Sequence, residues 1–191
     1  MPATPSTMIA LGTAMPSFDL PVTNAGPYER VASADLAENP VLVMFICNHC
    51  PFVKHICHEL AKLGNEYAAS ALQIIAINSN DITTHPDDAP DKMAQEAASA
   101  GYTFPYAFDE SQQIAHAFGA ACTPDFFLYD ANHSLAYRGQ LDGSRPNNGI
   151  PVTGEDLRAA INAVLAGKAA AAAQIPSIGC NIKWKPGNEP D

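Results

Sequence analysis

Two cysteines separated by two residues, in the segment Cys47–Cys50 (Cys-Asn-His-Cys), constrain this chain more than any other feature of its sequence. The segment follows the apolar run 40–46 and precedes a helix-like pattern that begins at Pro51. Side chains three residues apart on a helix are neighbours, so the two thiols lie close enough to form a disulfide and to release it. The segment therefore predicts a strand, a helix and a redox-active pair between them.

Around this segment the hydrophobic pattern predicts alternating strands and helices. The runs 41–46 and 72–78 have no polar alternation, which is expected of strands that are covered on both faces. Between them, apolar residues recur at spacings of three or four, as on a helix packed against a sheet: Val53, Ile56, Leu60, Leu63 and Tyr67. These elements predict a βαβ unit with the cysteines at its first turn.

Shorter elements flank this unit. Segments 18–22 and 28–31 surround a turn signal at 24–26 and predict an N-terminal hairpin. Thr153 and Asp156 resemble a capping box that opens a helix ending at Gly167. Further helices are expected at 88–100 and 111–118, and strands at 104–108, 126–129 and 135–139. We expect one domain at residues 1–167, including the hairpin, and a C-terminal tail at 168–191 that packs on it.

The composition limits the classes of partner. The formal net charge is −10 and the pI is about 4.8, which argues against nucleic acid because its binding depends on Lys and Arg. No basic residue precedes Arg30 and no stretch approaches membrane-spanning length, so we expect neither a secretory signal nor a membrane partner. A cytoplasmic location is the expectation, with protein or small-molecule disulfides and thiols as partners.

The expected cytoplasmic location guides the interpretation of the five cysteines. In a reducing cytosol structural disulfides are rare, and Cys-X-X-Cys pairs are catalytic or metal-binding. We expect Cys47 at a helix N-terminus, where its thiolate is favoured, and the imidazolium of His49 to lower its pKa further and to raise the reduction potential. Cys47 would then attack a partner's disulfide and Cys50 would resolve the mixed disulfide.

A second segment, Cys122-Thr123-Pro124-Asp125, precedes a predicted strand. A proline at the start of a strand is a plausible place for a cis peptide bond. Such a loop would present the Thr123 backbone beside the cysteines, so Thr123 and Pro124 are candidate supporting residues.

Taken together, these segments resemble the thioredoxin-like superfamily, and more closely the peroxiredoxin-like proteins of the AhpC/TSA type. The similarity spans nearly the whole chain and rests on residues 16–20, 45–54, 122–130 and 179–184. It implies an α/β thioredoxin fold, a central mixed sheet flanked by helices, with an N-terminal hairpin and an extended tail. It also implies Cys47 as the nucleophile, Cys50 as the resolving thiol and Pro124 as a cis-proline facing them, with antioxidant activity and no cofactor.

The departures from these relatives concern proton transfer and peroxide chemistry. Ile46 and the apolar strand before it replace the tryptophan and the buried acid of related thioredoxins, so Cys50 lacks its usual proton acceptor. Peroxiredoxins place a Thr or Ser three residues before the reactive cysteine. Counting back from Cys50 gives Cys47, and counting back from Cys47 gives Met44, so neither register supplies the hydroxyl.

Two alternatives stay open beside disulfide exchange: a thiol peroxidase, and a copper or zinc carrier in which Cys47 and Cys50, with His49, hold the ion. Cys57 lies about 10 Å along the helix from Cys50, too far to share a tetrahedral ion, and we expect no resident metal. Cys180 and Cys122 are candidate additional redox thiols. The remaining residues considered are expected to be structural or isolated: Cys57, His58, His85, His116, His133, Arg138, Asp109 and Asp142. The oligomeric state is left open.

Overall fold

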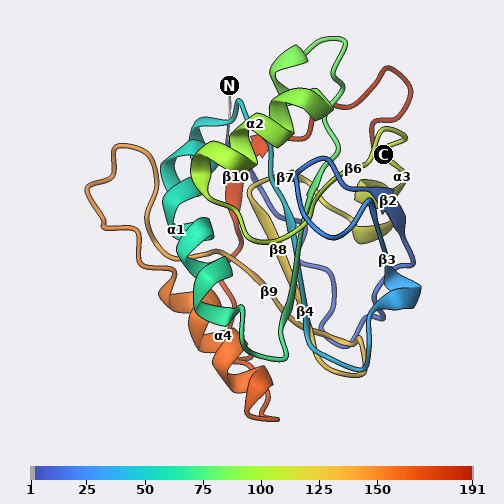
Figure 1. Ribbon diagram of the computed structural model, residues 1–191. Helices are drawn as coiled ribbons and strands as arrows, with labels where there is room; N and C mark the ends of the chain where they lie inside the picture. Colours follow the sequence, from blue (N-terminus) through green and yellow to red (C-terminus); the bar gives the residue numbers. More distant parts are fainter. Residues whose placement is uncertain (1–2, 191) are drawn as a thin grey trace.

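The computed structural model describes residues 3–190, and a five-stranded mixed sheet lies at its centre (Figure 1). The strand order is β6-β5-β4-β8-β9, in which β4, β5 and β6 are parallel and β8 and β9 are antiparallel to their neighbours. The bounds are β4 Val41–Phe45, β5 Gln73–Asn78, β6 Tyr106–Phe108, β8 Asp125–Tyr129 and β9 Leu135–Gly139. Helix α1 (Pro51–Tyr67) connects β4 to β5, so the predicted βαβ unit is confirmed.

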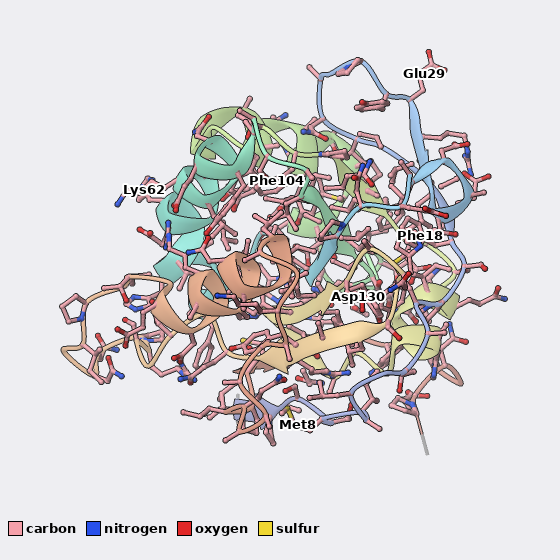
Figure 2. All side chains as sticks on the ribbon, turned by 90° about the horizontal axis from the view of Figure 1, so that it is seen from below. Met8, Phe18, Glu29, Lys62, Phe104 and Asp130 are labelled. Atoms are coloured by element: carbon pink, nitrogen blue, oxygen red, sulfur yellow. The ribbon has the colours of Figure 1, made fainter. Side chains whose placement is uncertain are left out.

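Both faces of this sheet are covered, which explains the continuous apolar runs. Leu42 and Met44 face a core shared with α1, α2 (Pro90–Ala100) and α4 (Glu155–Leu165). Val43 and Phe45 alternate with them and face a second core, which includes Phe118 of α3 (Gln113–Phe118). In Figure 2 side chains fill these layers, with Phe104 inside and Lys62 projecting into solvent.

The N-terminal hairpin lies on the α3 side of the sheet (Figure 1). Its strands β2 (Asp19–Pro21) and β3 (Arg30–Ala32) pair in antiparallel, as the sequence predicts, and a short 3₁₀ turn, η1 (Ser33–Asp35), follows. A second 3₁₀ turn, η2 (Pro86–Asp88), precedes α2, which ends at Gly101 in a left-handed conformation (φ 77°).

The tail contributes a strand that the sequence pattern does not reveal. β10 (Ile178–Asn181) lies between β1 (Ala3–Pro5) and β7 (Cys122–Thr123) in a separate three-stranded sheet, and packs beside α1 (Figure 1). The segment Ile-Gly-Cys-Asn is too short and too mixed to show a period of two. Residues 1–2 of the expected domain and residue 191 of the expected tail lie outside the described residues, and the boundary at 167 stays a prediction.

The start of α4 differs from the expected capping box. The N-cap is Gly154 in a left-handed conformation (φ 65°), and no side chain of the helix caps it. The backbone N–H groups of Thr153 and Gly154 instead donate to Asp142 Oδ2, at 2.7 and 2.6 Å. The capping-box prediction is therefore wrong, because a more distant carboxylate satisfies these donors. Within the described chain, no helix has the length and apolar character needed to cross a membrane.

Candidate active site at the start of helix α1

The two cysteines lie in the loop that leaves β4 and at the first turn of α1. The helix begins at Pro51, and Cys50 is its N-cap residue, with φ −67° and ψ 125°. Cys47 lies three residues earlier, so its expected position at the helix N-terminus is wrong: the open amides of the helix favour charge on Cys50 instead. Cys47 is 2% exposed and Cys50 is fully buried.

Thr123 links the two sulfur atoms. Cys47 Sγ lies 3.3 Å from Thr123 Oγ1, and Cys50 Sγ donates to the Thr123 carbonyl oxygen at 3.2 Å. Both sulfur atoms therefore lie against the same residue. The Thr123–Pro124 peptide bond is cis, as the resemblance implies. The structure thus brings four of the predicted site residues together, while their catalytic roles stay predictions.

The two thiols have opposite tendencies to ionise. A hydrogen bond from Cys47 lowers the pKa of Cys50 to about 4, against the effect of burial, and the N–H groups of Val53 and Cys180 lower it further. Burial raises the pKa of Cys47 well above its usual value, and its hydrogen bond to Cys50 and the charge of Asp88 add to this. The pKa values of the two thiols are therefore shifted in opposite directions.

A buried carboxylate that sequence reasoning missed, Asp88, completes the loop around Cys47. It accepts hydrogen bonds from the Asn48 N–H (2.7 Å) and from Asn80 Nδ2 (2.8 Å), and it pairs with His49 Nδ1 at 2.6 Å. Burial raises its pKa, but the hydrogen bonds from His49 and Asn80 outweigh burial, so the pKa of Asp88 is lowered. Asp88 is therefore a carboxylate at neutral pH.

A topological signal could have identified Asp88. β4 and β5 are adjacent parallel strands, so the loops that follow their carboxyl ends meet at the same edge of the sheet. The sequence interpretation assigned the acids near 88 to a helix start instead. His85, expected to be isolated, belongs to the same loop: its ring stacks on that of His49, with centroids 4.8 Å apart. His49 Nε2 is buried and has no hydrogen-bond partner within residues 3–190.

The same loops bring together a set of potential metal ligands. Cys47, His49 and Asp88 each offer one ligand atom, and these atoms lie within 4.8 Å of one another. The expected chelating set was Cys47, Cys50 and His49, so the structure adds Asp88 to it. A thiolate, an imidazole and a carboxylate suit zinc, which binds all three types.

The other two candidate thiols face different surroundings. Cys180 pairs with Thr123 across β10 and β7, and Thr123 contacts the Cys50 sulfur, so Cys180 is part of the site. Cys122 points its sulfur to the Pro124 carbonyl oxygen at 3.5 Å, and burial raises its pKa strongly. Cys57 is half-buried and His58 is exposed on the body of α1, away from the pair.

A buried ion pair holds the loop that carries Thr123. Arg138 Nη2 lies 3.0 Å from Asp125 Oδ2, and both side chains are fully buried. Arg138 also donates to the carbonyl oxygens of Phe118 and Gly119, and Asp125 accepts the N–H of Ala121. Arg138 therefore has a structural role, as expected, because it holds the two ends of the loop that contains the cis-proline.

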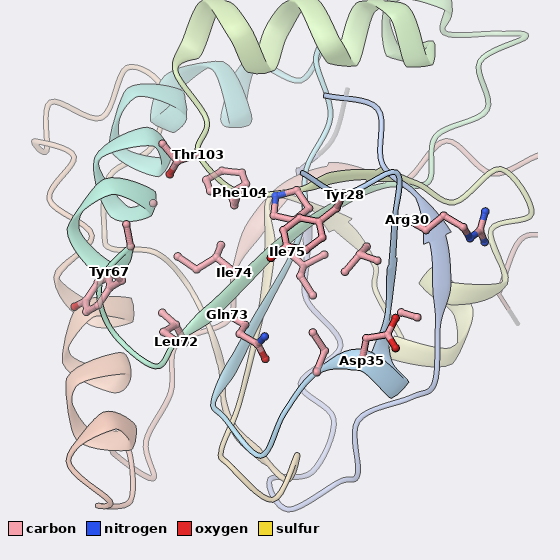
Figure 3. A pocket seen from close by; sticks show the side chains of 16 residues that line it. Tyr28, Arg30, Asp35, Tyr67, Leu72, Gln73, Ile74, Ile75, Thr103 and Phe104 are labelled. Carbon is pink, nitrogen blue, oxygen red and sulfur yellow. The ribbon is translucent and has the colours of Figure 1, made fainter. Parts of the chain in front are cut away.

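A large groove lies at the other end of the sheet (Figure 3). Its volume is about 580 Å³, and it is lined by the hairpin, the last turns of α1 and the start of β5, including Tyr28, Tyr67 and Gln73. None of its lining residues belongs to the cysteine site.

Comparisons with known proteins agree with this arrangement. Residues 11–138 match the model of the AhpC/TSA family. An uncharacterized conserved protein from Geobacillus kaustophilus is 50% identical, with 98% of each chain covered and a TM-score of 0.94. A hypothetical protein from Sinorhizobium meliloti 1021 is 48% identical, with 96% of this chain and 100% of that chain covered and a TM-score of 0.92.

More distant structures show the fold alone. A thiol:disulfide interchange protein of the thioredoxin family from Chlorobium tepidum TLS is 16% identical, with 82% of this chain and 99% of that chain covered and a TM-score of 0.62. No curated protein matches the chain. The family model covers more than half of the sequence and the structure superposes on such neighbours with a TM-score of 0.62, so the chain has a thioredoxin fold and belongs to the AhpC/TSA family.

Proposed function

We propose that this protein is a thiol–disulfide oxidoreductase in which Cys47 and Cys50 cycle between dithiol and disulfide. The observation that carries the proposal is that Thr123 holds both sulfur atoms, with Cys47 Sγ 3.3 Å from its Oγ1 and Cys50 Sγ 3.2 Å from its carbonyl oxygen. Two thiols held beside one another supply the attacking and the resolving sulfur, which disulfide exchange requires in turn.

The reaction begins with ionisation of Cys47. When Cys47 loses its proton to solvent, it becomes the thiolate and attacks a disulfide of the partner. The S–S bond of the partner breaks, and its leaving thiolate takes up a proton from solvent. Cys50 then loses its proton and attacks the Cys47 sulfur, which releases the second partner thiol. The partner gains two electrons and Cys47–Cys50 becomes a disulfide.

The reaction requires that a partner's disulfide reach the buried cysteine pair. Cys50 is fully buried and Cys47 is 2% exposed, so a partner reaches neither thiol without movement of the surrounding loops. The side chain of His49, 15% exposed, lies beside Cys47 and contacts His85. We propose that the loop carrying His85 moves aside when a disulfide of a protein or a small molecule enters.

Insulin reduction in the presence of dithiothreitol, measured by turbidity, tests the proposal. Wild-type protein is expected to accelerate it, and Cys47→Ser is expected to reduce the rate to the uncatalysed level. Cys57→Ser removes a half-buried thiol of α1 and serves as the matched control, with wild-type activity expected. Equal rates for Cys47→Ser and wild type would exclude the pair as the reacting group.

A thiol peroxidase is the second candidate, and one contact favours it. Neither cysteine has the Thr or Ser that peroxiredoxins place three residues before the reactive cysteine. However, Thr123 Oγ1, from a different strand, lies 3.3 Å from Cys47 Sγ. Peroxide consumption measured beside insulin reduction separates the two activities. If Thr123 orients a peroxide, Thr123→Val abolishes peroxide consumption and leaves the Cys47–Cys50 disulfide able to form.

A metal carrier is the non-enzymatic candidate, favoured by the proximity of Cys47, His49 and Asp88. Protein purified without chelator would then contain zinc or copper in a 1:1 ratio, and Asp88→Asn would reduce this content. Metal well below one equivalent in wild-type protein, together with active insulin reduction, would support the oxidoreductase instead.

A further inference from the structure

A third cysteine, Cys180 of the tail, lies close to Cys50, the resolving thiol. Cys180 is 5% exposed and lies opposite Thr123 in the pair of β10 and β7, and the Thr123 carbonyl oxygen lies 3.2 Å from Cys50 Sγ. The two thiols, Cys50 and Cys180, also influence each other's pKa. Cys50 therefore has a thiol neighbour on each side, Cys47 in its own loop and Cys180 from β10. The proposed cycle of Cys47 and Cys50 makes no use of this third thiol.

The position of Cys180 is fixed by strand pairing and not by a loose tail. In the antiparallel pair of β10 and β7, Cys180 lies opposite Thr123, the residue that contacts both other cysteines. A Cβ atom at Gly179 would lie 2.0 Å from the Thr123 carbonyl oxygen, so only glycine permits this close approach of the two strands. Sulfur atoms that are held in contact on rigid elements exchange disulfides efficiently.

We propose that Cys180 is a third redox residue, which takes over the disulfide from the active-site pair by forming a Cys50–Cys180 bond. In this step the Cys180 thiolate attacks the Cys50 sulfur of the Cys47–Cys50 disulfide. The old S–S bond breaks and Cys47 leaves as a thiolate, which takes up the proton that Cys180 gave up. The number of disulfides is unchanged, so no oxidant or reductant is needed.

Oxidation of the active-site pair itself prepares Cys180 for this step. In the dithiol state burial raises the pKa of Cys180 to about 12, and its hydrogen bond to Cys50 and the Cys50 charge contribute. The last two causes disappear once Cys50 is bonded to Cys47, while the charge of Lys183 continues to favour the thiolate. The exchange returns Cys47 to the thiol form while the protein still holds a disulfide.

This inference rests on the proposed function, and peptide mapping distinguishes the two. Trypsin places Cys47 and Cys50 on one peptide, 31–54, and Cys180 on another, 169–183. A Cys47–Cys50 bond therefore closes a loop within one peptide, whereas Cys50–Cys180 links two. After oxidation by diamide and quenching in acid, we expect both forms in wild-type protein, with the loop forming first and the linked form appearing at a rate independent of protein concentration.

The decisive variant is Cys47→Ser, which leaves Cys50 and Cys180 as neighbours. We expect the linked peptides in nearly every molecule of this variant, and their loss in Cys47→Ser/Cys180→Ala. Cys122→Ser is the matched control, because Cys122 lies on the paired strand but points elsewhere, and it should leave the linked form unchanged. Circular dichroism confirms that each variant folds.

The possible outcomes separate the two claims. If oxidised Cys47→Ser keeps Cys50 and Cys180 as free thiols that N-ethylmaleimide labels after unfolding, while wild-type protein still forms the loop, the role of Cys180 is overturned and the oxidoreductase proposal stands. If wild-type protein forms no loop, yet Cys47→Ser forms the linked peptides, the proposed function is overturned and the Cys50–Cys180 pair stands.

Discussion

Two fully buried acids, Asp88 and Asp125, support the cysteine site from different sides, and they differ in the partner that each has. Asp125 pairs with Arg138 at 3.0 Å, a cation that does not lose its proton in proteins. Asp88 pairs with His49 at 2.6 Å, and the His49 side chain is 15% exposed. The Asp125–Arg138 pair is fully enclosed by the fold, whereas the Asp88–His49 pair reaches solvent beside Cys47.

The pKa values of the two acids are also shifted in opposite directions, because burial dominates at one and hydrogen bonds at the other. Burial raises the pKa of Asp125 to about 6, and the charge of Arg138 offsets this only in part. At Asp88 the hydrogen bonds outweigh burial and lower the pKa. Only Asp88 acts on Cys47, whose pKa its charge raises. We infer that the Asp125 pair determines whether the cis-proline loop forms, and the Asp88 pair determines how readily Cys47 reacts.

Breaking the Asp125–Arg138 pair is expected to give the largest loss in the free energy of unfolding. Arg138→Leu leaves the Asp125 carboxylate buried without a cation and removes the hydrogen bonds to Phe118 and Gly119. Removing one partner of a buried pair typically lowers the free energy of unfolding by about 3–5 kcal/mol. Urea unfolding followed by circular dichroism measures it.

A matched control uses another Arg–Asp pair of the same chain. Arg30 lies 2.8 Å from Asp19, but the two side chains are 55% and 61% exposed. Arg30→Leu should therefore lower the free energy of unfolding by only about 0–1 kcal/mol. Equal losses for the two variants would mean that burial does not distinguish the pairs.

The contrast between these acids also shows how far sequence reasoning reaches. The strand Val41–Phe45 and the stripe of α1 are local patterns, and both were predicted with the two cysteines between them. The hairpin and the cis-proline were predicted from local signals too, the second with help from the family resemblance. These features depend on periodicity and on turn residues, which a single sequence displays.

Asp88 and the partner of Cys180 depend instead on contacts between distant segments. Asp88 lies about 40 residues from His49, and nothing in its own neighbourhood distinguishes it from a helix-start acid. Cys180 was named as a candidate redox thiol, but its partner followed only from the pairing of β10 with β7. The capping box at Thr153 failed in the same way, because Asp142 reaches the helix start from another loop.

The Asp88–His49 pair is expected to have a smaller effect on stability than the Asp125–Arg138 pair. Asp88→Asn puts an amide where a carboxylate accepts hydrogen bonds from Asn48, His49 and Asn80, so at least one donor loses its acceptor. We expect a loss of about 1–3 kcal/mol in the free energy of unfolding at pH 7. Urea unfolding of both proteins measures it.

The pH dependence of this loss checks its cause. The pKa of Asp88 is lowered in the folded protein, so its stabilising contribution is present above the unfolded value of about 3.9 and is lost as the pH falls through the folded value. The difference between wild type and Asp88→Asn should therefore shrink below about pH 4. A difference that stays constant down to pH 3 would assign the loss to packing and not to charge.

Asp88→Asn should also change the reactivity of Cys47. Asp88→Asn removes a negative charge that raises the pKa of Cys47, so the Cys47 thiolate forms at lower pH. We expect faster alkylation of Cys47 by iodoacetamide at pH 7, measured by mass spectrometry of peptide 31–54 in a Cys50→Ser background. Alkylation of the half-buried Cys57, in the body of α1, should be unchanged in the same samples.

The smallest effect is expected at His49, although the sequence suggested a strong one. An imidazolium beside the pair favours the reduced form, but the Asp88 carboxylate lies 2.6 Å away and offsets most of that charge. His49→Gln should therefore lower the reduction potential by less than about 30 mV, the equivalent of about 1.4 kcal/mol, in equilibrium with dithiothreitol or glutathione buffers. In an Asp88→Asn background the offset is absent, so the same His49→Gln change should have a larger effect. If His49→Gln shifts the potential equally in both backgrounds, Asp88 does not balance His49, and the distinction between the two buried pairs would not extend to the redox chemistry.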